Sequence, residues 1–284
     1  MSKKYALVYQ MGKVASSAIC NSFKNHEQYR ALHTHFLSLY GKKKLVKFCF
    51  KESLPKDYNE SMRQQFRIVK NIRAKLETYK KKLSVITIVR DPIAVIVSSF
   101  FERHELFSID KLSIRKDKNK PKRAISLKQL QDKFLDHIFN YNSIPEKIDF
   151  IGRARYFYLQ FPLTFIKDEL GRTCDINIYN IPLNKKDLYY IYDCNKYKIL
   201  LLKYENMFSH LETTINKFLN IKDFKLLDVK SARGSHLYYH YNDFVKSLVI
   251  SEEILEYYYS SEYMRHFYSR KEIEKFKERW SAKC

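Results

Sequence analysis

The stretch YALVYQMGKVASSAICNSF, residues 5–23, decides the fold expected for this chain. Residues 5–9 form a short apolar run bounded by polar residues, which is typical of a buried strand. After residue 15, Ala18, Ile19 and Phe23 recur at helical spacing. The sequence therefore predicts a strand, a short turn and a helix that starts near Ser16.

Residues 12–17 (GKVASS) occupy the turn and the start of the predicted helix. The first N–H groups of a helix lack intrahelical acceptors and lie at the positive end of its dipole, so phosphate binds there readily. Lys13 adds a cation, and Ser16 and Ser17 add hydroxyl donors. The stretch predicts an anion site, and an ordinary helix start capped by serine is the alternative.

This stretch is not a kinase-type Walker A motif. The pattern GxxxxGK[ST] would need glycine at position 7 and serine or threonine at position 14, where this chain has Leu7 and Val14. The hydroxyl after the lysine holds magnesium in that motif, and valine offers no such oxygen. We therefore expect a phosphate site without a dedicated metal ligand.

A second candidate segment follows residues 84–89 (SVITIV), a continuous β-branched run that predicts another buried strand. Arg90 leaves the carboxyl end of this strand, where open α/β sheets bind ligands. Ser98 lies eight residues later, about two turns into the next predicted helix. A guanidinium and a hydroxyl so placed can converge on one phosphate. The alternative is that Arg90 pairs with Asp91 or a surface acid while Ser98 packs against a helix.

The rest of the chain continues the alternation of strands and helices. Further strands are expected at residues 175–181 and 198–203, and helices at residues 62–82, 93–102, 127–139, 151–161, 204–219 and 252–280. This alternation predicts an α/β fold with a mainly parallel central sheet flanked by helices. We expect a single domain over residues 1–284, with helical or basic insertions at about residues 50–82 and 103–150.

The composition adds a strong charge. The chain has 53 Lys and Arg against 31 Asp and Glu, a net charge of +22. Such a field attracts nucleotides, acidic polysaccharide, nucleic acid or an anionic membrane surface, although a lysine-rich surface without a specific partner is the alternative. Five cysteines without a CxxC spacing fit reduced thiols. With no leader or membrane-length apolar run, the sequence predicts a cytoplasmic protein, or one at the inner face of the membrane.

Residues 10–17 and residues 90–98 together resemble the P-loop sulfotransferases. The stretch QMGKVASS is similar to bacterial capsular polysaccharide synthesis proteins, and the similarity extends through residues 175–179, 198–206 and 263–280. The resemblance implies a three-layer P-loop fold and 3′-phosphoadenosine 5′-phosphosulfate (PAPS) as the donor, with no metal.

The resemblance also assigns roles to residues. Binding of the 5′-phosphosulfate falls to the loop Gly12, Lys13, Val14, Ala15, Ser16 and Ser17, and binding of the 3′-phosphate to Arg90 and Ser98. Arg233, in the pair Arg233-Gly234, partly matches an element that closes over the nucleotide in some members. Position 15 is alanine where many family loops carry glycine, so a tighter or differently turned loop is expected.

The acceptor hydroxyl must lose a proton, so the site needs a base. In glycosaminoglycan sulfotransferases a His-x-His supplies it, and His33 and His35 lie between the two phosphate segments, with His35 matching the second histidine. On a strand both would point to one face. Glu102 and Glu205 are rival bases, and histidines that only pack or face solvent are the alternative.

The function implied is transfer of a sulfuryl group to a hydroxyl of a carbohydrate, such as a capsular or surface polysaccharide. The first alternative is a nucleotide-dependent kinase, in which Asp91 would hold magnesium. The second is a basic polyanion-binding protein without catalysis, which would use the net charge and the basic run at residues 111–123. That run either grips an acidic acceptor or is a solvated insertion. No specific nucleic acid partner is expected, and the oligomeric state is left open.

Overall fold

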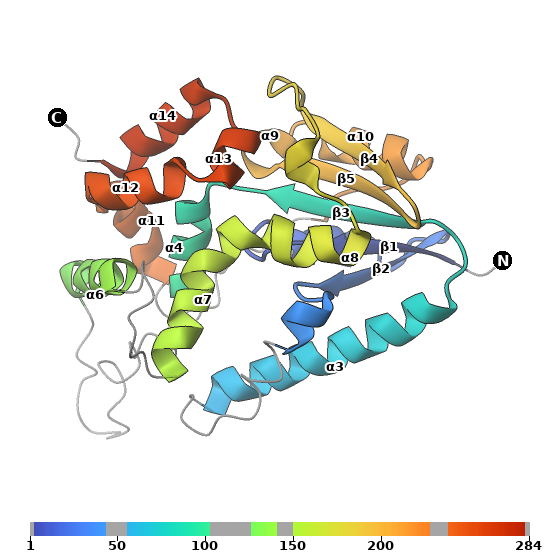
Figure 1. Ribbon diagram of the computed structural model, residues 1–284, viewed down its shortest axis with the longest axis horizontal. Coiled ribbons are helices and arrows are strands. Elements are labelled where there is room, and N and C mark those ends of the chain that lie inside the picture. Colours follow the sequence, from blue (N-terminus) through green and yellow to red (C-terminus); the bar gives the residue numbers. More distant parts are fainter. Residues whose placement is uncertain (1–2, 44–55, 103–125, 141–149, 228–237, 282–284) are drawn as a thin grey trace.

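The computed structural model describes residues 3–43, 56–102, 126–140, 150–227 and 238–281. Its centre is one five-stranded sheet (Figure 1). In spatial order the strands are β2 (Tyr29–Thr34), β1 (Lys4–Tyr9), β3 (Leu83–Val89), β5 (Tyr197–Lys203) and β4 (Tyr189–Cys194). The first four are parallel, and β4 pairs antiparallel with β5.

The connections reverse direction at β1. The chain passes from β1 through α1 (Ser16–Ser22) to β2 on one side, and then through α3 (Lys56–Thr78) to β3 on the other side. Right-handed crossovers in opposite directions place their helices on opposite faces of the sheet. A crevice opens at the carboxyl ends of the strands where the order reverses. The fold therefore puts a ligand crevice at the ends of β1 and β3.

The remaining helices surround this sheet. Figure 1 shows α7 in front of the strands and α10 behind β5 and β4. In chain order they are α4 (Pro92–Glu102), α6 (Leu127–Asn140), α7 (Phe150–Phe165), a π-helix (Ile166–Gly171), α8 (Arg172–Cys174), a 3₁₀-helix (Ile178–Asn180), α9 (Tyr204–Met207), α10 (Leu211–Leu219), α11 (Tyr238–Ser247), α12 (Glu252–Tyr259), α13 (Glu262–Phe267) and α14 (Arg270–Trp280).

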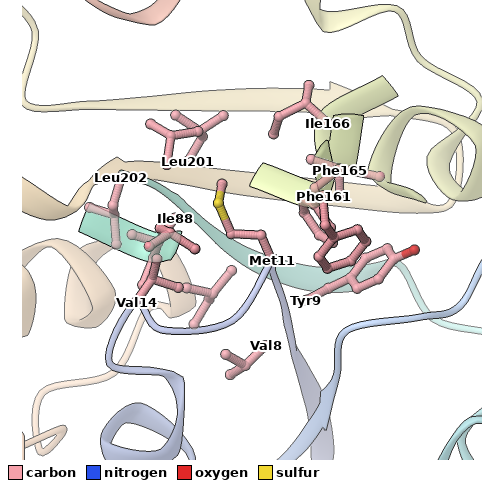
Figure 2. Packing of buried hydrophobic residues seen from close by; sticks show 14 of the residues in the cluster. Val8, Tyr9, Met11, Val14, Ile88, Phe161, Phe165, Ile166, Leu201 and Leu202 are labelled. Atoms are coloured by element: carbon pink, nitrogen blue, oxygen red, sulfur yellow. The ribbon is translucent and has the colours of Figure 1, made fainter. Parts of the chain in front are cut away.

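The core lies between the sheet and these helices. The parallel strands are apolar along their length because both of their faces are covered, and Val8, Ile88 and Leu201 are fully buried. The Phe165 ring of α7 meets the Tyr9 ring edge to face at 5.2 Å between centroids. Figure 2 shows Met11, just past β1, pointing into the same packed layer. This packing fixes the end of β1, from which the candidate anion loop departs.

The predicted α/β class with a mainly parallel sheet is confirmed, but one predicted strand is wrong. Residues 175–181 form a turn and the short 3₁₀-helix instead of a strand. Asp175 adopts a left-handed conformation at the end of α8, with φ 53°. The Asn177 side chain accepts a hydrogen bond from the Tyr179 N–H at 3.2 Å. These Asp and Asn turn preferences override the apolar alternation of the segment.

Two strands were not predicted as such. The edge strand β4 contains Asp193, and β2 carries Arg30 and His33, so neither shows a continuous apolar run. None of the helices in the described ranges combines the length and the apolar composition that a bilayer-spanning helix needs.

Candidate active site

Four strand ends lie side by side along one edge of the sheet. Neighbouring strands are about 4.8 Å apart, so the ends of β2, β1, β3 and β5 span roughly 14 Å. A cleft of about 990 Å³ follows this edge. It is lined by one group after each strand: His35 after β2, Lys13 after β1, Arg90 after β3 and Tyr204 after β5. The structure thus brings together predicted candidates from three segments and adds Tyr204 from a fourth.

The loop after β1 has an unusual backbone. Gly12, Lys13 and Ala15 have φ values of 97°, 58° and 62°. Glycine adopts such angles freely, whereas a left-handed L-residue costs about 1–2 kcal/mol. The Val14 side chain is fully buried and points into the core near Ile88 (Figure 2). Its burial anchors the loop, so Val14 contributes a backbone position to the cleft rather than a side-chain ligand.

The hydroxyls of this loop are not helix caps. The residue that caps α1 is Ala15, which has no side-chain hydrogen bond to offer, while Ser16 and Ser17 lie within the first turn. Ser16 is buried and Ser17 is exposed, and both line the cleft. The serine-cap alternative for this stretch is therefore wrong.

Lys13 faces a carboxylate across the cleft. Its Nζ lies 3.4 Å from Oε2 of Glu102, at the end of α4. The Glu102 side chain is 52% exposed, and an exposed ion pair of this kind stabilises by at most about 1 kcal/mol. A bound anion can therefore replace Glu102 as the partner of Lys13 at small cost.

Arg90 is held by contacts on every side. Its guanidinium donates a hydrogen bond to the Lys13 carbonyl oxygen. Its Cζ lies 4.1 Å from the centroid of the Tyr204 ring. The Tyr263 hydroxyl accepts a hydrogen bond from the Arg90 N–H at 2.8 Å and donates one to the Arg90 carbonyl at 2.9 Å. The contact with Lys13 puts the two predicted anion-binding segments against each other.

Ser98 joins Arg90 in lining the cleft, as its position in α4 predicts. Its Oγ lies 3.4 Å from the Tyr241 hydroxyl. Tyr241 also lines the cleft, so two hydroxyls lie together in the cleft that Arg90 lines.

Asp91 is turned away from the cleft and is almost fully buried. One carboxylate oxygen accepts hydrogen bonds from the Ile93 N–H and the Tyr259 hydroxyl, and the other accepts one from Trp280 Nε1 at 2.9 Å. Burial raises the pKa of Asp91, and the hydrogen bonds from Trp280 and Tyr259 oppose the rise. Asp91 therefore fastens the start of α4 to the C-terminal helices. Within the described ranges, no cluster of three or more His, Cys, Asp or Glu side chains could hold a metal ion.

The histidine pair is organised by Gln10, which is fully buried. The Gln10 carbonyl can only accept, so the contact of 2.8 Å from His35 Nδ1 places a proton on that nitrogen. In neutral His35 the lone pair then lies on Nε2, the nitrogen a base would use. The Gln10 side chain also reaches back to the loop, because its Oε1 accepts a hydrogen bond from the Gly12 N–H.

His33 has a different role. The His33 and His35 rings contact each other, with their centroids 4.8 Å apart at an angle of 84°, although β2 ends at Thr34 and His35 lies just after it. His33 Nε2 is 3.3 Å from the Gln10 side-chain nitrogen, which donates to it. Burial, and then the neighbouring His35, lower the pKa of His33 to about 3. His33 is therefore neutral near pH 7 and supports His35.

Comparisons with protein-family models, with curated proteins and with solved structures find no match to this chain. Any functional conclusion therefore comes from the residues of the cleft themselves.

Glu205, a rival base, is fully engaged. One carboxylate oxygen accepts a hydrogen bond from the Asp91 N–H at 2.7 Å, and the other accepts one from the Tyr268 hydroxyl at 3.0 Å. Burial of the carboxylate raises its pKa. Glu205 therefore ties the end of β5 to the turn after β3.

Several residues of the site were not predicted. Gln10 organises the histidines, Tyr204 covers Arg90, and Tyr263 holds the Arg90 backbone. Tyr263 lies 173 positions from Arg90, and no local pattern signals such a contact. Arg233 and the basic run at residues 111–123 fall outside the described residues, so their roles stay predictions.

Proposed function

We propose that this chain is a sulfotransferase that moves a sulfuryl group from PAPS to a hydroxyl of a carbohydrate, such as a capsular or surface polysaccharide. One observation carries the proposal: the Arg90 guanidinium contacts the Lys13 carbonyl, so two anion-binding segments 77 positions apart share one cleft. An adenosine phosphorylated at both its 3′ and 5′ positions needs cations at two places.

The residues present fit such a nucleotide. Lys13, Ser16 and Ser17 would hold the 5′ end beside the loop, and Arg90 with Ser98 would hold the 3′-phosphate through charge-assisted hydrogen bonds. The cleft volume of about 990 Å³ is at the upper end of ligand pockets, which leaves room for an acceptor. The bound donor would supply an activated sulfuryl group.

The order of the strand ends supports an in-line displacement. His35 Nε2 would take the proton of the acceptor hydroxyl from the β2 side. Lys13, in the middle, would stabilise the charge that develops on the departing phosphate oxygen. The bond between sulfur and that oxygen breaks as the bond between sulfur and the acceptor oxygen forms. Neutral His33 adds no charge that would oppose protonation of His35.

The alternatives have less support. A kinase needs an acid to hold magnesium, but the carboxylate of Asp91 is directed at Tyr259 and Trp280. A polyanion-binding protein would not need the positive-φ turn or the buried Gln10 that fixes the histidines. The three-layer P-loop fold, and a place in the cytoplasm or at the inner membrane face, belong to the same proposal.

The proposal is tested by incubating the purified chain with sulfur-labelled PAPS and candidate glycans, with mass spectrometry of the products. Lys13→Ala is expected to lower transfer by about 100-fold or more, the usual effect of removing one group that stabilises a developing negative charge. Lys24→Ala is the control, because Lys24 is exposed just after α1 and does not line the cleft. Full activity of the Lys13 variant would end the proposal.

A further inference from the structure

The end of the cleft beyond His35 is lined mainly by aromatic and other uncharged side chains. Residues from three elements line it: the segment after β2, α3 and α7. We name this region the acceptor lobe, and its described side chains are Phe36, Met62, Gln65, Phe157, Tyr158 and Phe161. None of these six carries a formal charge.

The aromatic part of the acceptor lobe is a packed wall. The Phe36 ring lies 5.1 Å from that of Phe161 and 5.8 Å from that of Phe157, in stacked arrangements with interplanar angles of 28° and 29°. All three are at least 91% buried. Such a wall presents fixed apolar surface, which suits the face of a ring that has no charge to solvate.

Among the described residues, none of the charged side chains that line the cleft comes from the segment after β2, from α3 or from α7: these side chains are Lys13, Arg90, Glu102 and Glu212. Arg90 follows β3, two strands and about 10 Å from the histidines that end β2. On α3, Arg63 and Arg67 are exposed, and neither lines the cleft. Arg73 of the same helix donates a hydrogen bond to the Leu37 carbonyl. A carboxylate held in the acceptor lobe would therefore lose water without gaining a cation from the described residues that line the lobe, which is unfavourable.

We infer, resting on the proposed function, that the acceptor is an uncharged alcohol whose ring face packs on the acceptor lobe, and not an acidic polysaccharide. The hydroxyl would lie at His35 Nε2, which takes its proton as the acceptor oxygen gains the sulfuryl group. The shared chemistry is an uncharged hydroxyl next to an apolar ring face, which a neutral sugar and an aryl alcohol both provide. In this case the net charge of +22 would attract anions to parts of the chain other than the acceptor lobe.

A matched pair of probes tests the inference directly. The compounds 4-nitrophenyl β-glucoside and 4-nitrophenyl β-glucuronide differ by one carboxylate, and 2-naphthol offers a hydroxyl without a sugar. With labelled PAPS, kcat/KM for the glucoside should exceed that for the glucuronide at least tenfold. The site of the label, on the sugar or on naphthol, distinguishes the two sources of the hydroxyl. Equal or better use of the glucuronide would overturn the inference.

Two neighbouring glutamines provide matched variants. Gln65 lines the acceptor lobe, whereas Gln64 is exposed and does not. Gln65→Arg supplies the missing cation and should lower the glucoside preference at least tenfold, while Gln64→Arg should leave it unchanged. An unchanged preference in Gln65→Arg would contradict the placement of the acceptor.

A binding readout separates this inference from the proposed function. Saturation-transfer NMR measures glucoside and glucuronide binding to the protein loaded with 3′,5′-adenosine bisphosphate, the product of the donor. If that nucleotide does not bind, the proposed function fails. If it binds and the glucuronide binds as well as the glucoside, the inference alone fails.

Discussion

The two walls of the cleft are built in different ways. The wall formed by the loop after β1 and the histidines after β2 is held by contacts within 25 positions, chiefly through Gln10. The wall formed by Arg90 is held by Tyr204 and Tyr263, which lie 114 and 173 positions away. The local wall carries a strained turn and the histidine proposed as the base, whereas the long-range wall carries a fixed cation. In the proposed function this difference would divide the roles: Arg90 would recognise the ligand, and the groups of the local wall would take part in the reaction.

Breaking the long-range wall should have the largest effect on nucleotide binding. Arg90→Lys removes the planar fork that stacks on Tyr204 and that, in the proposed function, would pair with two phosphate oxygens. The Kd for 3′,5′-adenosine bisphosphate should rise between about tenfold and a hundredfold, while the Kd for adenosine 5′-monophosphate changes little. Isothermal titration calorimetry measures both.

The matched control for this variant is Arg172→Lys. Arg172 also lies over a tyrosine ring, 5.0 Å from the centroid of Tyr40, but outside the cleft lining. If Arg90→Lys discriminates the two nucleotides as well as the parent chain does, Arg90 does not hold the 3′-phosphate.

Burial of His33 in the local wall should make the free energy of unfolding depend on pH. The pKa of His33 is lowered to about 3 in the folded chain, so the unfolded chain binds an extra proton below about pH 6.5. The contribution of His33 is therefore complete above that pH and is lost as the pH falls toward 3. From about pH 7 to pH 5 the contribution of His33 to the free energy of unfolding should fall by about 2 kcal/mol.

Urea unfolding of the parent and of His33→Gln at several pH values measures this effect. The fall in the free energy of unfolding should be smaller in the variant, because glutamine does not titrate. Parallel curves for the two proteins would show that His33 is not buried as a neutral ring.

The backbone strain in the loop after β1 can be relieved by substitution at Ala15. Ala15→Gly removes the Cβ from a residue at φ 62° and should raise the free energy of unfolding by about 0.5–1 kcal/mol. Ala18→Gly, in the middle of α1, should lower it by about 1 kcal/mol. Denaturation midpoints compare the two, and a loss of stability in both would argue against a left-handed Ala15.

The difference between the two walls also accounts for which parts of the fold and of the candidate site could be predicted from the sequence. The strand, turn and helix of residues 5–23 are encoded within a few residues, so the apolar run and the position of Lys13 sufficed. The Arg90 and Ser98 spacing is equally local, and it placed both in the cleft. The buried parallel strands β3 and β5 were visible as apolar runs.

The supports of Arg90 could not be predicted, because they depend on tertiary contacts. No local motif links Tyr263 or Trp280 to the turn after β3. In the structure, the Tyr263 hydroxyl binds the Arg90 backbone, and Trp280 Nε1 donates a hydrogen bond to Asp91. The strand predicted at residues 175–181 was wrong for a different reason, which is local. There the local turn chemistry of Asp175 and Asn177 outweighed an apolar alternation.

The smallest effect is expected where the two walls meet. Glu102, at the end of the helix that follows β3, pairs with Lys13 and so competes with a bound anion. Glu102→Gln should tighten binding of 3′,5′-adenosine bisphosphate by about twofold to fivefold. Glu60→Gln is the control, since Glu60 pairs with Arg67 at 3.5 Å outside the cleft lining. Weaker or unchanged binding in Glu102→Gln would show that Glu102 does not compete with a bound anion for Lys13.

Titration of the parent chain with adenosine nucleotides tests most directly whether both walls grip one ligand. In EDTA, 3′,5′-adenosine bisphosphate should bind at least tenfold more tightly than adenosine 5′-monophosphate, and added magnesium should not improve ATP beyond it. Tighter binding of ATP with magnesium, or equal binding of the bisphosphate and the monophosphate, would contradict the shared site of Lys13 and Arg90.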